Sequence, residues 1–131
     1  MKIEEMIKKL NTIHEIKNMK PICGFEDYLI SKSGIVYSLK SNKFLSIGNN
    51  ATGGYYYVDL YKDGKKYRKR IHVIVMETFS TRPNLSYEID HKDGNKSNNN
   101  LSNLEYVTHA ENVRRYHSRK IQSLFKDKIK K

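Results

Sequence analysis

The sequence predicts an α+β fold, in which an N-terminal helix and a small antiparallel β module precede a strand–loop–strand–helix unit. Three patterns indicate this. Residues 3–17 carry apolar side chains at helical spacing, residues 25–70 hold short β-prone runs, and residues 86–118 place a polar loop between two strands that a helix follows. With 131 residues, the chain can form one compact domain or two small lobes that share a core.

The first expected element is an amphipathic helix over residues 3–17. Its apolar positions recur every three or four residues, with lysine and glutamate between them, and they are Ile3, Met6, Ile7, Leu10 and Ile13. Pro21 and Gly24 end the pattern. We expect the apolar face of this helix to pack on its own domain rather than to be reserved for a partner.

The next segment is β-rich. The runs DYLIS (27–31), GIVYSL (34–39) and KFLSI (43–47) are separated by Ser-Gly and Ser-Asn turn signals. YYYVDLY, KDGK and KYRKRI then predict a hairpin with a tight turn at Asp63-Gly64. Tyrosines concentrate in this segment, where cross-strand packing is their ordinary role.

Residues 71–80 (IHVIVMETFS) fit two patterns. The β-branched run favours a strand, whereas Ile71, Ile74, Val75 and Thr78 also lie on one helical face, so the pattern alone leaves both open. Residues 103–108 (NLEYVT) predict a strand. Thr108–Glu111 then has the sequence of a capping box, and the helix it starts reaches about Ser118, with continuation through the basic tail left open.

The charge of the chain predicts a polyanionic partner. Lysine and arginine number 25 against 14 acidic residues, a formal net charge of +11. Residues 61–70 hold six bases and one acid, and residues 113–131 hold eight bases and one acid, whereas residues 86–112 hold two bases and five acids. This reversal of sign suits a metal-dependent enzyme that acts on a polyphosphate, although solvated surface would also explain both basic runs.

Several other classes of protein do not fit the composition. No apolar run approaches the ~20 residues of a transmembrane helix, and the N-terminus lacks the layout of a signal peptide. The single cysteine, Cys23, excludes an intramolecular disulfide and a Cys-rich zinc module. We therefore expect a soluble, intracellular protein that binds a polyanion.

Three polar residues stand out by position. Asp90 and His91 are adjacent where the first strand of the 86–118 unit enters the loop, and Asn112 lies in the first turn of the closing helix. Carboxylate and amide oxygens suit Mg²⁺ or Mn²⁺ rather than zinc, and Mg²⁺ needs only one or two protein ligands when phosphate and water supply the rest. In an extended chain His91 points away from Asp90 and is free to act as a base. Each residue alone is explained equally well by a solvated surface turn.

Taken together, these residues resemble the HNH nuclease motif in the form found in phage- and intron-associated endonucleases. The motif appears here as DHKDGNKSNNNLSNLEYVTHAEN, with His91 at its first position, Asn103 twelve residues later and Asn112 at the last. GFEDYLISKSGIVYSL is similar to the β module that often precedes this nuclease in homing endonucleases. RIHVIVMETF is similar to the connecting helix, which favours helix over strand at residues 71–80.

The resemblance implies a ββα-metal finger with one divalent cation, Mg²⁺ or Mn²⁺, per active site. Asp90 and Asn112 would be the ligands, His91 the general base, and Asn103 a catalytic-loop residue that orients His91. The implied reaction is hydrolysis of DNA to 5′-phosphate and 3′-hydroxyl ends. The implied division of the chain is an N-terminal amphipathic helix (1–20), a β-rich DNA-binding module (21–70), an HNH nuclease domain (71–118) and a basic tail (119–131).

The resemblance also implies a location in the cytoplasm of a bacterial host cell, with a gene that belongs to the host or to a phage. The expected partner is double-stranded DNA rather than a membrane, and the oligomeric state, monomer or homodimer, stays open. The cations expected to contact DNA are Lys66, Arg68, Arg70, Arg114, Arg115 and Arg119. Two alternatives remain: a DNA-binding module that keeps the fold without cutting, and membrane-surface binding by residues 113–131. Larger family members continue into further DNA-binding segments, and the helix at residues 3–17 lies outside the resemblance.

Overall fold

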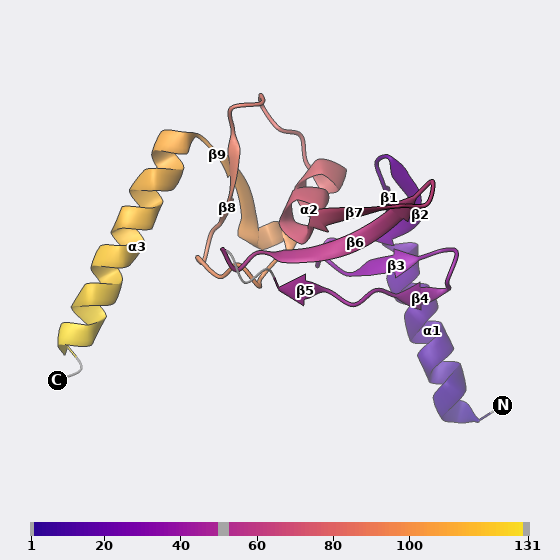
Figure 1. Cartoon of the computed structure of the whole chain (residues 1–131). Coiled ribbons are helices and arrows are strands. Elements are labelled where there is room, and N and C mark those ends of the chain that lie inside the picture. The colour runs from indigo at the N-terminus through magenta and orange to yellow at the C-terminus, as the bar shows by residue number, and fades with distance from the viewer. Residues whose placement is uncertain (1, 50–52, 130–131) are drawn as a thin grey trace.

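A computed structural model describes residues 2–49 and 53–129, with the side chains of residues 10–15 and 126–129 outside the described set (Figure 1). The helices are α1 (Ile3–Lys17), α2 (Ile71–Phe79), the 3-10 turn η1 (Leu101–Asn103) and α3 (His109–Ile129). The strands are β1 (Lys20–Ile22), β2 (Phe25–Ile30), β3 (Val36–Ser38), β4 (Lys43–Phe44), β5 (Gly48–Asn49), β6 (Tyr56–Lys62), β7 (Lys65–Arg70), β8 (Glu88–His91) and β9 (Leu104–Val107). The α+β prediction is confirmed.

Within the described residues the strands form three antiparallel sheets, β1-β2-β3-β4, β5-β6-β7 and β8-β9. The predicted β6–β7 hairpin closes with a two-residue turn, since Lys62 pairs with Lys65. Asp63 and Gly64 both have positive φ, 51° and 76°, which a type I′ turn requires. β1 and β5 were not expected from the sequence.

Helix α2 settles the ambiguity at residues 71–80. It lies between the β6–β7 hairpin and the β8–β9 hairpin and contacts both (Figure 1). Ile71, Ile74 and Val75 are buried there, so the β-branched residues serve a helical apolar face rather than a strand. Tertiary packing on both sides outweighs their modest helix propensity.

One hydrophobic core extends across the expected boundary at residues 70 and 71. Val58 and Leu60 from β6, Ile74 and Val75 from α2, and Leu104 from β9 belong to the same buried cluster. The β module and the β8–β9 hairpin are therefore packed on opposite sides of one helix.

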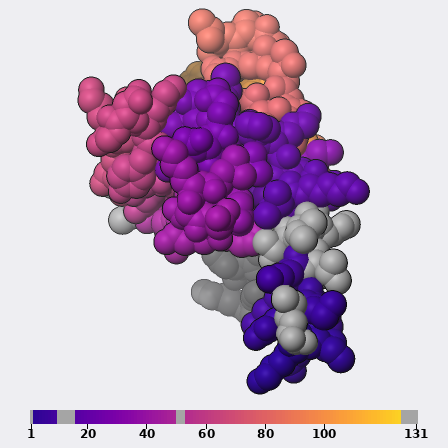
Figure 2. Space-filling model, turned by 90° about the vertical axis from the view of Figure 1, so that its right-hand side faces the viewer, coloured from indigo at the N-terminus to yellow at the C-terminus, as the bar shows by residue number. Residues whose placement is uncertain are grey.

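The expectation for α1 is wrong for its described side chains. Ile3, Met6 and Ile7 are 75%, 49% and 51% exposed, and Leu10 and Ile13 lie outside the described set. The helix runs away from the body (Figures 1 and 2). Among its described side chains, Ile16 near the C-terminal end packs against the small cluster that includes Met19 and two β-module residues.

Helix α3 extends beyond Ser118, the residue at which the sequence predicted its end, and reaches Ile129. No glycine or proline interrupts residues 109–129, so nothing in the sequence breaks the helix before Ile129. Thr108 caps its start, because the Glu111 N–H donates to the Thr108 Oγ1 at 3.2 Å. The Glu111 carboxylate binds Arg114 and Arg115 instead of completing the capping box. Among the described residues no helix is long and apolar enough to span a bilayer.

Candidate active site

Strand β8 distributes the predicted site residues between its two faces. Successive side chains of a strand point in opposite directions, so Glu88 and Asp90 share one face and Ile89 and His91 share the other. Glu88 and Asp90 bind side chains of α3. His91 instead meets Asn99 of the loop and His72 of α2. The expectation that His91 points away from Asp90 is confirmed.

A pocket with a volume of about 640 Å³ brings together three of the four residues predicted to be catalytic or to bind the metal. Asp90 and His91 line it from β8, and Asn112 lines it from the first turn of α3. Tyr55 and Lys96 complete its rim from the chain before β6 and from the loop after β8. Asn103 is not part of this lining, which separates it from the other motif residues.

His91 is buried, and one of its ring nitrogens is already bound. Its Nε2 lies 2.8 Å from the Asn99 Oδ1, and Asn99 is itself buried. The His91 ring is 5.0 Å from the His72 ring, centroid to centroid, and 6.2 Å from the Tyr55 ring. Since Nε2 faces Asn99, Nδ1 is the nitrogen left for the pocket.

His72 of α2 contacts the His91 ring from inside the protein. It stacks on Tyr55 with 4.9 Å between ring centroids, and its Nδ1 is buried without a hydrogen-bond partner. Burial, together with the nearby His91 and Arg70, lowers the pKa of His72 from its ordinary 6.5 to about 3. His72 is therefore a neutral ring at physiological pH.

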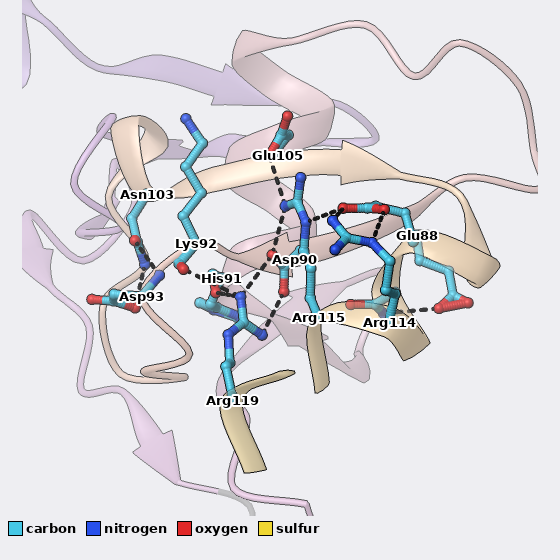
Figure 3. A network of polar contacts seen from close by, with 12 residues as sticks. Glu88, Asp90, His91, Lys92, Asp93, Asn103, Glu105, Arg114, Arg115 and Arg119 are labelled. Carbon is cyan, nitrogen blue, oxygen red and sulfur yellow. Dashed lines mark hydrogen bonds and ion pairs between the residues drawn. The ribbon is translucent and has the colours of Figure 1, made fainter. Parts of the chain in front are cut away.

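Asp90 is held by two arginines of α3 (Figure 3). Arg115 Nη1 donates to the Asp90 Oδ2 at 2.9 Å, and Arg119 donates to both carboxylate oxygens at 3.1 and 3.0 Å. Burial alone would raise the pKa of Asp90, but hydrogen bonds from Arg119 and Arg115 and their positive charges outweigh it, so the net pKa is lowered. Asp90 is thus an ionised oxygen donor that a cation would have to share with, or take from, these arginines.

Asn112 offers the second oxygen. Its Nδ2 donates to the Glu88 Oε1 at 2.9 Å, which fixes the amide and leaves Oδ1 as the hard donor atom on the pocket side. The described residues contain no group of three or more His, Cys, Asp or Glu side chains that could hold a metal. The Asp90 carboxylate and the Asn112 amide oxygen are hard donors of the kind that Mg²⁺ takes, and neither is the nitrogen or sulfur ligand that zinc prefers.

Asn103 ties the two ends of the loop together. Its Oδ1 accepts from the Asp93 N–H at 3.1 Å, and its Nδ2 donates to the Asp93 Oδ1 at 2.9 Å (Figure 3). The same Nδ2 also donates to the Asn98 carbonyl at 2.9 Å. Asn103 is buried, so these bonds replace lost water contacts. The geometry is that of a loop brace, and Asn98, which Asn103 holds, is the neighbour of Asn99, whose side chain touches His91.

Most of the cations expected to contact DNA are already bound to acidic or aromatic side chains of the protein itself. Arg114 binds Glu111, and Arg115 binds Glu105 and Glu111 as well as Asp90. Within β7, Arg68 pairs with Asp59 at 3.0 Å and lies over the Tyr57 ring. Arg70 lies over the Tyr55 ring, next to the pocket. Arg115 and Arg119 therefore form ion pairs with acidic side chains of the protein itself. The basic run in which they lie did not indicate these ion pairs.

Sequence reasoning missed four residues around His91. Asn99, His72, Tyr55 and Lys96 come from the loop, from α2 and from the chain before β6. The Lys96 ammonium lies 4.6 Å from the centroid of the Tyr55 ring and donates to the Gly53 carbonyl. Only the three consecutive asparagines at 98–100 carried any signal, and nothing in the sequence showed which of them is buried.

Comparison with known proteins agrees with this geometry. Residues 69–114 match the model of the HNH endonuclease family. The chain is 40% identical over 101 residues to the DNA endonuclease I-HmuI of Bacillus phage SP01, a match that covers 76% of this chain and 58% of that protein. It is 40% identical over 96 residues to the H-N-H endonuclease F-TflII of Escherichia phage T5, which covers 72% of this chain and 49% of the relative.

A solved structure supports the same assignment. The structure described as DNA binding and cleavage by the HNH homing endonuclease I-HmuI superposes with a TM-score of 0.72 at 37% identity, covering 82% of this chain and 66% of that one. The chain therefore belongs to the HNH endonuclease family. An uncharacterized HNH endonuclease of Acanthamoeba polyphaga mimivirus is also similar, 34% identical over 87% of this chain and 34% of that protein. The chain thus spans about a third to three fifths of the length of these curated relatives.

Proposed function

We propose that the chain is a DNA endonuclease that hydrolyses phosphodiester bonds with one divalent cation, Mg²⁺ or Mn²⁺, and leaves 5′-phosphate and 3′-hydroxyl ends. The observation that carries this proposal is the convergence of Asp90, His91 and Asn112 on one pocket, in the order that the HNH motif requires. The substrate is double-stranded DNA, in keeping with the net charge of +11.

Each site residue then has one task. His91 takes a proton from the attacking water through Nδ1, since its Nε2 is bound to Asn99. Asp90 and Asn112 hold the cation with one oxygen each, and Asn103 braces the loop between β8 and η1. When bound, the cation would neutralise phosphate charge and stabilise the leaving 3′ oxygen.

The basic residues hold the substrate. Arg70 and Lys66 share one face of β7 with Arg68, and Arg119 and Lys120 line the pocket from α3. These cations can bind the phosphates on either side of the cleaved bond. Two of the relatives are phage proteins, which supports action in the cytoplasm of an infected bacterium.

A second candidate is a DNA-binding module that does not cut. The pairing of Asp90 with Arg115 and Arg119 favours it, because both carboxylate oxygens are occupied by arginine. The two candidates differ in one simple measurement. A nuclease nicks or linearises plasmid DNA with Mg²⁺ and stops in EDTA, whereas a binding module shifts DNA on a gel and leaves it intact under both conditions.

Replacing the general base tests the mechanism. We expect His91→Ala to slow single-turnover cleavage by about 10²–10⁴ while DNA affinity stays near that of the parent, because a base acts in the transition state. His117→Ala is the matched control, an exposed histidine on α3 outside the pocket. Parental cleavage by His91→Ala would remove His91 from the reaction.

A further inference from the structure

Asn99 determines which nitrogen of His91 can be a base. The amide oxygen of Asn99 can only accept a hydrogen bond, so the His91 Nε2 at 2.8 Å must carry the proton. A neutral imidazole protonated on Nε2 has its lone pair on Nδ1, the ring nitrogen that Asn99 does not bind, and His91 lines the pocket. Both side chains are buried, 7% exposed for Asn99 and 6% for His91, so water does not replace this bond.

A turn of the β module holds Asn99 from behind. This turn, residues 31–35, joins β2 to β3, and Gly34 at its centre is buried against Ile71 and Asn99. A Cβ on Gly34 would lie 2.9 Å from the Ile71 Cγ2 and 3.3 Å from the Asn99 Cβ, and its φ of +90° is one that glycine adopts readily. Only a glycine fits this contact without moving Asn99 or Ile71.

The same turn is also bonded to the loop through the backbone. The Leu101 N–H donates to the Lys32 carbonyl at 2.7 Å, two residues after Asn99. The turn is closed on itself by bonds from the Gly34 N–H to the Ser31 carbonyl and from the Ser31 N–H to the Ile35 carbonyl. The backbone is thus fixed on both sides of Asn99 in the sequence, at Leu101 by the turn and at Asn98 by Asn103.

We propose that Asn99 is a positioning residue that keeps His91 in the Nε2–H form with Nδ1 facing the pocket, and that the 31–35 turn of the β module holds Asn99 in place. The inference rests on the proposed role of His91 as the general base. On this proposal the 31–35 turn of the β module supports the active site, in addition to any contact that the module makes with DNA.

The first test observes the proton on His91 directly, without DNA or metal. In protein labelled with ¹⁵N-histidine, the parent should show a low-field ring N–H proton that exchanges slowly with water and correlates with Nε2. The His91→Gln variant assigns this signal among the five histidines of the chain. Asn99→Asp keeps an acceptor oxygen and should keep the signal, whereas Asn99→Leu should lose it. A proton on Nδ1 in the parent, or a signal that survives in Asn99→Leu, would overturn the proposal.

The second test measures cleavage at saturating DNA and DNA affinity separately. Small misplacements of a catalytic group cost about 10² in rate, so we expect Asn99→Leu to slow cleavage about 100-fold with its DNA dissociation constant within about twofold of the parent. Asn99→Asp should recover most of the loss. Asn84→Leu makes the same substitution at an exposed asparagine in the connection before β8 and should cut at the parental rate.

Gly34→Ala keeps the test decisive if Asn99→Leu does not fold. It alters no group of the pocket, and we expect at least about tenfold slower cleavage, unchanged DNA affinity and a weakened His91 N–H signal. Parental cleavage and an intact signal in folded Gly34→Ala would refute the role of the turn. If the parent itself does not cut DNA while the N–H signal behaves as expected, the proposed function fails and the Asn99–His91 arrangement stands.

Discussion

The buried, neutral His72 makes the stability of the protein sensitive to acid in a defined window. His72 is 6% exposed, stacked on Tyr55, and has a pKa lowered to about 3 by burial and by the neighbouring His91 and Arg70. Replacing it with phenylalanine keeps an aromatic ring in the stack and removes the titration. The prediction is that His72→Phe abolishes one component of the pH dependence of unfolding.

The sign and size follow from proton linkage. The unfolded chain binds a proton at His72 below its ordinary pKa of 6.5, and the folded protein does not until about pH 3. The free energy of unfolding is therefore unaffected by His72 above pH 6.5 and decreases as the pH falls from 6.5 towards 3. At 1.36 kcal/mol per pH unit, the decrease between pH 7 and pH 5 is about 2 kcal/mol, which is about an eighth to two fifths of the stability of a typical domain.

Chemical denaturation at pH 7 and pH 5 measures this decrease in the free energy of unfolding. The parent should lose about 2 kcal/mol more than His72→Phe over that interval. His117→Phe, at an exposed histidine, should keep the pH dependence of the parent. An equal loss in the parent and in His72→Phe would show that His72 takes up a proton in the folded state at ordinary pH, and the account of its burial would be refuted.

Three further outcomes test the loop, the arginines and the basic strand. Asn103→Ala leaves the Asp93 N–H and the Asn98 carbonyl unpaired, so a denaturation curve should show a loss of about 1–3 kcal/mol; unchanged stability would mean that Asn103 braces nothing. Arg119→Ala frees an Asp90 oxygen and should tighten Mn²⁺ binding, measured by electron paramagnetic resonance without DNA, about tenfold; weaker binding would show that Arg119 supports the cation. Arg70→Ala should reduce the slope of log affinity against log salt by about 0.9, and an unchanged slope would place Arg70 away from DNA phosphates.

Much of the fold could be predicted because it depends on local patterns. The Asp63-Gly64 turn needs two residues that tolerate positive φ, and the sequence shows them. The spacing of apolar residues over 71–80 did not decide between strand and helix, since it fits a helical face while the β-branched residues also suit a strand. The packing of α2 between two hairpins makes the helix the more stable structure. The exposure of Ile3, Met6 and Ile7 on α1 was not predictable, because amphipathic spacing does not show whether another part of the protein packs against the apolar face of a helix.

The candidate site was predictable where one short stretch supplies the residues. Asp90, His91 and Asn112 stand at motif spacing, and β8 and the start of α3 bring them to one pocket. Asn99 and His72 were missed because their contacts with His91 depend on the distant turn and helix packed behind the loop. Their burial is a tertiary property that no spacing in the sequence reports.

The core shared by β6, α2 and β9 bears on how segments of this protein can be exchanged with those of related sequences. A recombination event that joined residues 1–70 of one sequence to residues 71–131 of another would place its seam inside the cluster that contains Val58, Val75 and Leu104. Side chains fitted to one another would then come from different parents, and mismatched core volumes cost typically 1–3 kcal/mol or more. A seam after α1, near residue 18, or beyond the last α3 contact with Asp90 at Arg119 would cut no part of this core. Chimaeras joined at those two places should be more stable than a chimaera joined at residue 70, so the segment of this protein that has to be inherited together runs from β1 into α3.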